Sequence, residues 1–212
     1  MKKYSLIYAD PPWSYSNSVS NGAAVNHYGT MSLAELKRLP VWSLAHDDAV
    51  LALWYTGTHA AEAEELAEAW GFHVRQRFLF TWVKLTEQAE RTVNSELARQ
   101  SVIDFWDWLA LLDRVTRMNG GNYSRQNQES VLIAVRGRGL ERKNASVKQI
   151  IYSPLAEHSG KPGEARYRLE QLYGDVERIE LFSRGNTEGW AAWGNECHNS
   201  MRLAPAYWEN AE

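Results

Sequence analysis

Short apolar runs alternate with helical patterns along the first part of the chain. Residues 5–9 form an apolar run that stops at two prolines, and residues 49–55 form a second run. Both predict buried strands. Between them, Ser32-Leu33-Ala34-Glu35 is a capping box that predicts a short helix ending near Leu39. Residues 58–70, rich in Ala and Glu, predict another helix that Gly71 can close.

The second part continues this alternation after one interruption. Further strands are predicted over residues 78–83, 131–135, 149–152 and 178–182, and a helix over residues 162–173 between a proline and a glycine. Strands that alternate with helices imply an α/β fold with a mostly parallel sheet, which binds ligands beyond the carboxyl ends of its strands.

Residues 84–128 do not fit the alternation. Apolar residues recur at helical spacing between residues 102 and 118. We therefore predict a helical insertion over about residues 86–125, inside a single domain of residues 1–196. Residues 197–212 are expected to form a C-terminal tail.

Composition narrows the class of protein. Of 212 residues, 44% are hydrophobic and 23% are charged, so the chain should bury a core rather than remain disordered. No apolar run is long enough for a transmembrane helix, and the first run is too short for a signal peptide, so a cytoplasmic chain is expected. Cys197 is the single cysteine, which excludes an intrachain disulfide and a cysteine-built zinc site. The histidines show no ligand spacing, and no metal is expected.

Charge is unevenly distributed. The net charge is −3, but residues 114–148 hold eight basic and two acidic residues, a net of +6 that leaves −9 for the rest of the chain. A local basic surface on an acidic protein can hold a polyanion such as a nucleic acid. A solvated loop explains the charge equally well.

The sharpest feature is Asp10-Pro11-Pro12-Trp13, directly after the first predicted strand. This tetrapeptide is expected by chance in roughly one chain in a thousand of this length, or fewer. The alternative is a proline turn packed by a tryptophan. Its position at the end of a buried strand favours a catalytic loop.

The chemistry of this loop suits a purine amino group. Such a group is a poor nucleophile, because its lone pair is delocalised into the ring. Two acceptors on its two hydrogens draw the nitrogen toward a tetrahedral shape. The Asp10 carboxylate and the Pro11 carbonyl can be these acceptors, Pro12 fixes the chain direction, and Trp13 can stack on the base for roughly 1–3 kcal/mol.

The chain resembles the β-class adenine-N6 methyltransferases of the MT-A70 type over most of residues 4–196. The resemblance rests on a series of motifs that occur in the family's order. They are Ala9-Asp10-Pro11-Pro12-Trp13, Tyr28-Gly29-Thr30-Met31, Leu53-Trp54-Tyr55-Thr56-Gly57, Trp70-Gly71-Phe72, Trp82-Val83-Lys84, His158-Ser159-Gly160-Lys161-Pro162, Arg178-Ile179-Glu180-Leu181-Phe182 and Trp193-Gly194-Asn195-Glu196.

The resemblance implies a Rossmann-like fold in permuted order, with the catalytic motif before the cofactor motif, and S-adenosylmethionine as cofactor. Lys161 would meet the carboxylate of the cofactor, where a surface lysine beside a proline is the alternative. The further cofactor residues that the resemblance implies are Glu180, Phe182, Arg184, Asn186, Asn195 and Glu196. The loop through Asn186 is about one residue shorter than in the family.

Substrate contacts are expected at three places. By resemblance, Tyr28 lies in a loop that closes over the target adenosine, although a surface tyrosine is the alternative. Trp82 and Lys84 end a strand and can line the base pocket; Trp54 can line it too, or belong to the core. The segment with Asn122, Arg125, Asn127 and Glu129 can read base edges together with residues 136–148, or be a polar loop with no role.

The sequence therefore predicts an S-adenosylmethionine-dependent methyltransferase that acts on adenine N6. The resemblance to phage and prophage members suggests DNA as the substrate and partner. The alternatives are the same reaction on RNA and a catalytically silent nucleic-acid-binding partner of such an enzyme. No membrane association is expected, and an oligomer is possible without a defined size.

Overall fold

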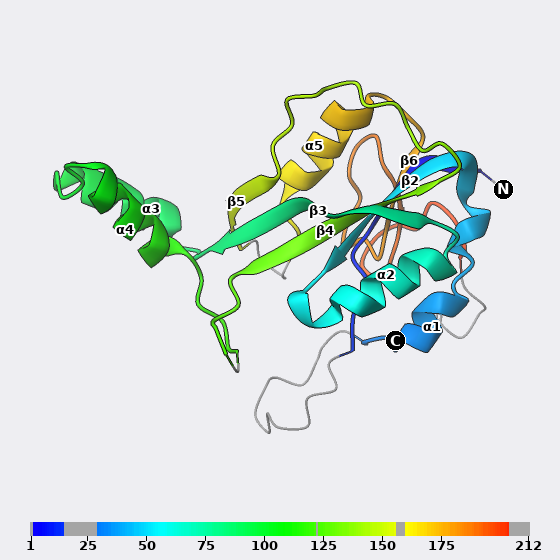
Figure 1. Cartoon of the computed structure of the whole chain (residues 1–212), viewed down its shortest axis with the longest axis horizontal. Helices are drawn as coiled ribbons and strands as arrows, with labels where there is room; N and C mark the ends of the chain where they lie inside the picture. Colours follow the sequence, from blue (N-terminus) through cyan, green and yellow to red (C-terminus); the bar gives the residue numbers. More distant parts are fainter. Residues whose placement is uncertain (1, 15–28, 122, 156–159, 204–212) are drawn as a thin grey trace.

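The computed structural model describes residues 2–14, 29–121, 123–155 and 160–203. A seven-stranded sheet lies at its centre, in the order β5-β3-β4-β2-β1-β6-β7 (Figure 1). The strands are β1 (Tyr4–Ala9), β2 (Ala45–Tyr55), β3 (His73–Leu85), β4 (Gln128–Arg136), β5 (Ile150–Pro154), β6 (Arg178–Leu181) and β7 (Ala191–Trp193). The α-helices are α1 (Leu33–Arg38), α2 (Ala60–Ala69), α3 (Ala89–Ala98), α4 (Phe105–Val115) and α5 (Gly163–Tyr173), with short 3₁₀ turns at Val41–Ser43 and Gly57–His59.

The sheet is mostly parallel, as predicted. Among the described strands, β4 alone runs antiparallel, and it pairs with both β2 and β3. The chain leaves the sheet at the carboxyl end of β3, forms α3 and α4, and returns beside that same end. The next strand, β4, therefore has to run in the opposite direction. The α/β class with a mostly parallel sheet is confirmed, but the reversed direction of β4 is not visible in the hydrophobic pattern.

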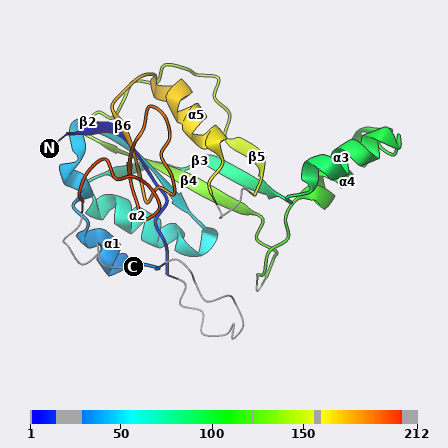
Figure 2. The same ribbon diagram turned by 180° about the vertical axis from the view of Figure 1, so that it is seen from behind.

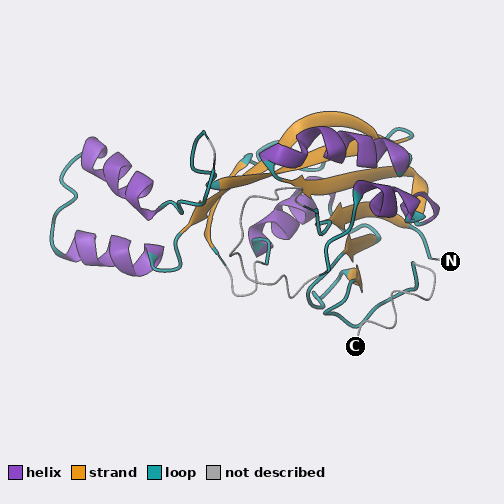
Figure 3. Cartoon of the chain, turned by 90° about the horizontal axis from the view of Figure 1, so that it is seen from below, coloured by secondary structure: helices purple, strands orange, loops and turns teal. Residues whose placement is uncertain are grey.

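Helices cover both faces of the sheet. Helices α1 and α2 lie on one face and α5 on the other (Figures 1 and 3). Along β1, Ile7 and Ala9 belong to the core under α1 and α2, whereas Leu6 and Tyr8 belong to the core under α5. Successive side chains of a strand point to opposite faces, so a strand buried on both sides needs the continuous apolar run at residues 5–9.

The predicted helix ends are mostly correct. The Ser32–Glu35 capping box forms, with the Glu35 amide donating to the Ser32 hydroxyl at 3.3 Å and the Ser32 amide donating to the Glu35 carboxylate at 2.8 Å. Gly71 and Gly174 follow α2 and α5 with φ values of +83° and +71°. The predicted helix over residues 102–118 is too long, because Asp104 caps α4 and starts it at Phe105.

Helices α3 and α4 do not cover the sheet. They project beyond the carboxyl end of β3 and the amino end of β4 (Figures 1 and 2). We call residues 86–118 the helical arm. Its own core is small and consists of Ala89, Leu111 and Val115, with Leu85, Val93 and Val102 packed against them. The division of the chain into a domain of residues 1–196 and a tail of residues 197–212 remains a prediction.

The sheet brings several segments to one edge. The carboxyl ends of β1, β2, β3 and β6 meet there, together with the amino end of β4. Because β4 runs the other way, Arg136 at its far end lies about 23 Å from Glu129 at its start. Arg136 donates to the Trp42 carbonyl at 2.6 Å, and Arg138 pairs with Asp48 at 2.6 Å. Arg136 and Arg138 therefore lie away from this edge, and a substrate contact by residues 136–148 stays a prediction.

Candidate active site

The Asp10-Pro11-Pro12-Trp13 loop leaves β1 at this edge and is held by its own main chain. The Trp13 amide donates to the Pro11 carbonyl at 2.9 Å, and the Met31 amide donates to the Pro12 carbonyl at 2.8 Å. Proline fixes φ at two successive positions, so these bonds act on a segment that is already restricted. The Pro11 oxygen has a second lone pair, and the turn fixes where it points.

The Trp13 side chain is anchored on one side. Its indole nitrogen donates to the Trp54 carbonyl at 3.1 Å, and its ring stacks on His59 with centroids 5.3 Å apart and planes 21° apart. His59 Nε2 lies 3.2 Å from the Ser14 carbonyl oxygen, and Nδ1 lies 3.0 Å from the Thr56 hydroxyl. Because a carbonyl only accepts, the first bond requires the proton on Nε2. His59 thus orients both the Trp13 ring and the chain that follows it.

Two adjoining cavities open around this loop. The larger has a volume of about 400 Å³, and the smaller has a volume of about 180 Å³. They share Asp10, Lys161, Phe182, Ser183 and Arg184. The larger is also lined by Pro11, Pro12, Trp13, Gly29, Thr30, Tyr55, Thr56, Trp82, Lys84, Glu129, Leu155, Trp193, Gly194, Asn195 and Glu196. Asp10 therefore lies at the junction of the two cavities.

Four charged side chains alternate in sign across the cavity. Lys161 Nζ lies 2.7 Å from Asp10 Oδ2 and 3.1 Å from Glu129 Oε2, and Lys84 Nζ lies 2.5 Å from Glu129 Oε1. Only 12–17% of each of these side chains is exposed. We call Asp10, Lys161, Glu129 and Lys84 the charge network. Its members come from four separate segments, and its formal charges sum to zero.

Mutual attraction in the network outweighs the cost of burial. Burial by itself raises the pKa of the Glu129 carboxyl, but Lys161 and Lys84 bring that pKa below its ordinary value. Burial by itself lowers the pKa of the Lys161 ammonium, but Asp10 and Glu129 bring it above its ordinary value. Glu129 and Lys161 are therefore both ionised at neutral pH, and each depends on its partners.

Aromatic rings support the two lysines. Lys161 Nζ lies 5.6 Å from the centre of the Trp54 ring, and Lys84 Nζ lies 5.2 Å from that of Trp82. Trp54 is fully buried, and its indole nitrogen donates to the Tyr8 hydroxyl at 2.6 Å. Trp54 is thus a core residue beneath Lys161, whereas Trp82 is a buried wall of the larger cavity.

Glu180 lies in β6 and faces the smaller cavity. Its carboxylate oxygens lie 3.1 and 3.2 Å from Arg166 Nη1 on α5. Burial raises the pKa of the Glu180 carboxyl, the nearby Asp10 raises it further, and Arg166 only partly offsets both effects. A buried carboxylate with a raised pKa is a common feature of functional sites. In its ionised form such a group destabilises the fold, so stability alone does not explain its presence.

The raised pKa of Glu180 gives a prediction for stability against pH. The folded state holds the Glu180 proton more tightly than the unfolded state, whose pKa is near 4.5. Glu180 therefore destabilises the fold increasingly as the pH rises above about 4.5. We expect Glu180→Gln to gain stability relative to the wild type between pH 4.5 and pH 7, as measured by urea unfolding at each pH. The exposed Glu164→Gln on α5 is the control, and an equal difference at every pH would contradict the prediction.

The predicted cofactor residues line both cavities. Asn195 and Glu196 line the larger one, Glu180 and Asn186 line the smaller one, and Lys161, Phe182 and Arg184 line both. The Asn186 amide is bonded to the main chain of His198, donating to its carbonyl at 2.9 Å and accepting from its amide at 2.8 Å. Asn186 therefore also fastens the loop after β7, which the sequence did not indicate.

Gly194 is required by the close approach of two loops. A Cβ atom at this position would lie 2.1 Å from the Ser183 carbonyl oxygen and 2.6 Å from the Ser183 nitrogen. The Ser183 amide donates to the Trp193 carbonyl at 3.0 Å, which holds the loops together. Beside it, Phe182 has a positive φ of 60° and packs edge-on against Trp193. The loops after β6 and β7 thus form one unit at the cavity wall.

We expect Gly194→Ala to lower the free energy of unfolding by about 1–3 kcal/mol, because backbone on both sides has to move. Urea denaturation measures this loss. Gly185→Ala is the matched control, since a Cβ atom there meets nothing within 4 Å. Equal unfolding midpoints for the two variants would contradict the contact.

The predicted substrate residues separate into three groups. Trp82, Lys84 and Glu129 line the larger cavity. Arg125 is exposed and Asn127 half-buried in the connection that leads into β4, and neither lines either cavity. Tyr28 and Asn122 lie outside the described residues.

Several cavity residues were missed by the sequence analysis. Tyr55 and Thr56 belong to a motif that was recognised without a role, and both line the larger cavity. His59 and Arg166 act through contacts with residues distant in the chain, so no local pattern indicates them. Ser183 was not singled out, yet it borders both cavities.

Two further findings concern the described residues only. In residues 2–14, 29–121, 123–155 and 160–203, no group of three or more His, Cys, Asp or Glu side chains is arranged to hold a metal ion. The same part of the chain contains no helix with the length and hydrophobicity needed to cross a membrane.

Comparison with known proteins gives a family match. The sequence pattern of the MT-A70 family matches residues 4–103 and 99–196, which together cover most of the chain.

Individual relatives agree with this match. The chain is 28% identical to the type II methyltransferase M.MunI of a Mycoplasma species, with 98% of this chain and 84% of that protein aligned. It is 27% identical to the human N(6)-adenine-specific methyltransferase METTL4, over 92% of this chain and 38% of METTL4. It is 24% identical to the human N(6)-adenosine-methyltransferase catalytic subunit METTL3, over 96% of this chain and 30% of METTL3. The chain thus spans most of the length of the first relative and about a third of the length of the other two.

Proposed function

The chain belongs to the MT-A70 family, and we propose that it transfers a methyl group from S-adenosylmethionine to the N6 amino group of adenine in DNA. The observation that carries the proposal is the position of Asp10, on a rigid proline loop at the junction of two cavities. One cavity suits a flat base beside Trp13, and the other adjoins the charged residues that a zwitterionic cofactor would need.

The choice of DNA rather than RNA as the substrate is inferred from the relatives. The type II methyltransferase aligns over most of its own length, so its overall plan is similar to that of this chain. The relatives that are named for adenosine, the ribonucleoside, are about three to four times longer. DNA is therefore the favoured substrate, and RNA is the alternative that the assay below tests.

The loop prepares the amino group for attack. The Asp10 carboxylate accepts one N–H of adenine, and the Pro11 carbonyl accepts the other through its second lone pair. The nitrogen lone pair then leaves conjugation with the ring. After methyl transfer, the methylated amino nitrogen loses one proton. Because the loop is already bonded in place, orientation can supply up to about 7–11 kcal/mol of the reduction in the barrier.

Trp13 and Trp82 hold the base. His59 covers one face of the Trp13 ring, and Trp13 lines the larger cavity, so a base would have to stack on the opposite face. A duplex target first has to be flipped out of the helix, at a cost of a few kcal/mol. Stacking on the ring and the bonds to Asp10 and Pro11 offset that cost.

The residues present fit S-adenosylmethionine. The cofactor carries a carboxylate, an ammonium group, ribose hydroxyls and an adenine. Lys161 and Arg184 can receive the carboxylate, Glu180 and Glu196 can receive the ammonium or the hydroxyls, and Asn195 can bond the adenine. When bound, the cofactor supplies a methyl group on a positively charged sulfur.

Parallel assays test the proposal. Purified chain is incubated with S-adenosylmethionine labelled in the methyl group and with DNA or RNA oligonucleotides of matched sequence. We expect label in DNA, as N6-methyladenine. Label in RNA alone would move the function to the alternative substrate. Absence of label together with absence of cofactor binding by calorimetry would indicate a silent nucleic-acid-binding partner.

A further inference from the structure

His59 is buried beside the catalytic loop and was not indicated by the sequence. It is 5% exposed, and it is the one buried histidine in the part of the chain that the structure describes. It ends the 3₁₀ turn Gly57–His59, between β2 and α2. A buried polar ring is costly unless its polar atoms are bonded, so its contacts indicate what the ring does.

Both ring nitrogens of His59 are directed at neighbouring groups. Nε2 lies 3.2 Å from the Ser14 carbonyl oxygen and 3.6 Å from the Glu62 carboxylate. Nδ1 lies 3.0 Å from the Thr56 hydroxyl and 3.3 Å from the Thr58 hydroxyl. Partners on both sides of an imidazole fix the orientation of its ring as well as its tautomer. His59 is therefore held firmly enough to position a neighbouring side chain.

The neighbour that His59 positions is the Trp13 ring, which lines the larger cavity. The Trp13 indole nitrogen donates to the Trp54 carbonyl at 3.1 Å. This bond fixes one edge of the ring but tolerates tilting, because the angular distribution at a carbonyl acceptor is broad. His59 lies nearly parallel to the ring, with centroids 5.3 Å apart and planes 21° apart. Contact along a whole face resists the tilt that the hydrogen bond permits.

We propose that His59 is a positioning residue for methyl transfer, which holds the plane of Trp13 and the main chain at Ser14 ready for the target base. The inference rests on the proposed function, because it takes Trp13 as the ring on which adenine stacks. A ring that is held before the base arrives loses little freedom on binding, so the affinity for the base is higher.

His59 contributes to binding of the base and not to activation of its amino group. Asp10 is held by Lys161 at 2.7 Å. The Pro11 carbonyl accepts from the Trp13 amide at 2.9 Å. Neither acceptor depends on the His59 side chain. Loss of an interaction that serves binding alone raises KM and leaves kcat unchanged, so the loss of His59 should change KM.

Steady-state kinetics with the preferred DNA oligonucleotide test this division. His59→Ala is expected to raise KM at least about tenfold, which is part of what stacking on Trp13 contributes, with kcat within about threefold of the wild type. The affinity for S-adenosylmethionine, measured by calorimetry, should also stay within about threefold. His73→Ala replaces an exposed histidine at the far end of the sheet, so it is the matched control and should change neither constant.

Two conservative variants separate the contacts of His59. His59→Phe keeps a flat ring against Trp13 but has no ring nitrogen, whereas His59→Gln keeps an N–H that can reach the Ser14 carbonyl but has no ring. We expect His59→Phe to recover a KM within about threefold of the wild type, and His59→Gln to recover less, because the face contact sets the plane of Trp13. A role in stability alone predicts instead that KM follows the urea unfolding midpoint of each variant.

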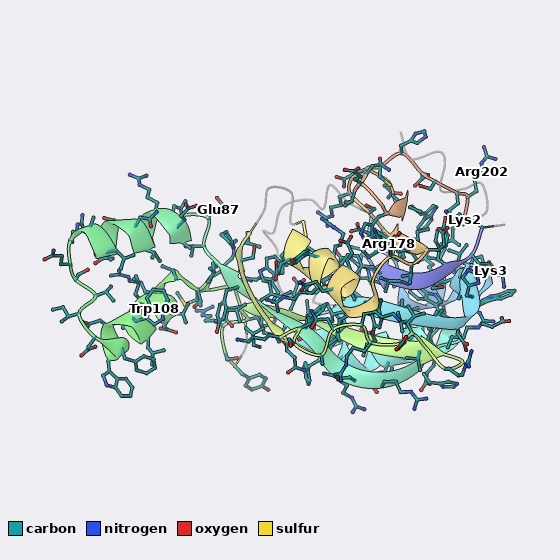
Figure 4. The ribbon with its side chains drawn as sticks, turned by 90° about the horizontal axis from the view of Figure 1, so that it is seen from above. Lys2, Lys3, Glu87, Trp108, Arg178 and Arg202 are labelled. Carbon is teal, nitrogen blue, oxygen red and sulfur yellow. The ribbon has the colours of Figure 1, made fainter. Side chains whose placement is uncertain are left out.

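The Trp13 indole N–H reports the position of the ring in the free protein, without substrate or cofactor. It is protected from exchange with deuterium while it is bonded to the Trp54 carbonyl, and its resonance is the one that disappears in Trp13→Phe. His59→Ala should raise its exchange rate at least about tenfold. Two other indoles are internal references that should not change. They are Trp70, which is fully buried, and Trp108, which lies on the helical arm away from the sheet (Figure 4).

Two results would overturn the proposal. One is equal Trp13 exchange in His59→Ala and the wild type, and the other is faster exchange with an unchanged KM for DNA. Where His59→Ala does not fold, His59→Gln gives the same two comparisons. A wild type that transfers no methyl group would contradict the proposed function, whereas faster exchange in the variant would still support the positioning of Trp13 by His59.

Discussion

Replacing Asp10 with alanine is expected to abolish methyl transfer, with kcat lowered by at least about 100-fold. Removal of one preorganised charged or hydrogen-bonding group from an active site commonly has an effect of this size. Here the loss is specific, because the Pro11 carbonyl would remain as the single acceptor for two amine hydrogens. The measurement is single-turnover transfer of the labelled methyl group to the preferred oligonucleotide.

Cofactor binding should survive the Asp10→Ala change. Lys161 keeps Glu129 as a partner, at 3.1 Å, so the ammonium stays in the cavity. Calorimetry with S-adenosylmethionine should give an affinity within about threefold of the wild type, a difference of less than 1 kcal/mol. Asp175→Ala, fully exposed near the other end of the sheet, is the matched control. Full activity in Asp10→Ala would remove the proposed mechanism.

Replacing Glu129 with glutamine is expected to damage both stability and activity. Glu129 is the shared partner of Lys84 and Lys161, and all three side chains are mostly buried. Removing one member of a buried ion pair typically costs 3–5 kcal/mol, because the other charge is left uncompensated. Lys161 retains Asp10, so we expect the lower end, about 3 kcal/mol, from urea unfolding. Activity should fall as well, because Lys161 would then be held by Asp10 alone.

A double variant distinguishes loss of the Lys84–Glu129 ion pair from other effects of the substitution at Glu129. If the cost of Glu129→Gln comes from the uncompensated Lys84, then adding Lys84→Met should recover part of the lost stability. Glu141→Gln provides a control in the exposed pair with Lys143, where little change is expected. A Glu129→Gln protein as stable as the wild type would mean that the charge network contributes nothing to the fold.

Local features of the site were predictable from sequence. The run at residues 5–9 and its two prolines predict a buried strand that ends in a rigid loop, because both effects depend on adjacent residues. The capping box at Ser32 and the glycine after α5 are equally local. Lys161 was identified through the resemblance and Glu129 through its polar segment, and both border the larger cavity.

The contacts between distant segments were not predictable. The sequence predicts that Lys161 meets a cofactor and Glu129 a substrate, but in the structure Lys161 pairs with both Glu129 and Asp10. This pairing depends on β4 running antiparallel, which brings Glu129 rather than Arg136 to the catalytic edge. The same reversal places Arg136 and Arg138 away from that edge. Strand direction is set by topology and leaves no periodic signal in one sequence.

The helical arm shows the same limit. The apolar stripe correctly indicated a helix near residues 105–115, but it could not show which side of that helix is buried. A helix with two apolar faces looks like a core helix in sequence. Only the structure shows that Phe105 and Trp106 stay in solvent.

The most direct test of the central claim is nucleoside mass spectrometry of DNA after incubation with the purified chain and S-adenosylmethionine. The claim is that Asp10 and the Pro11 carbonyl activate an adenine amino group for methylation. It predicts N6-methyladenine with the wild type and none above background with Asp10→Ala. Equal amounts of N6-methyladenine from both proteins, or methylation of a different base by the wild type, would contradict it.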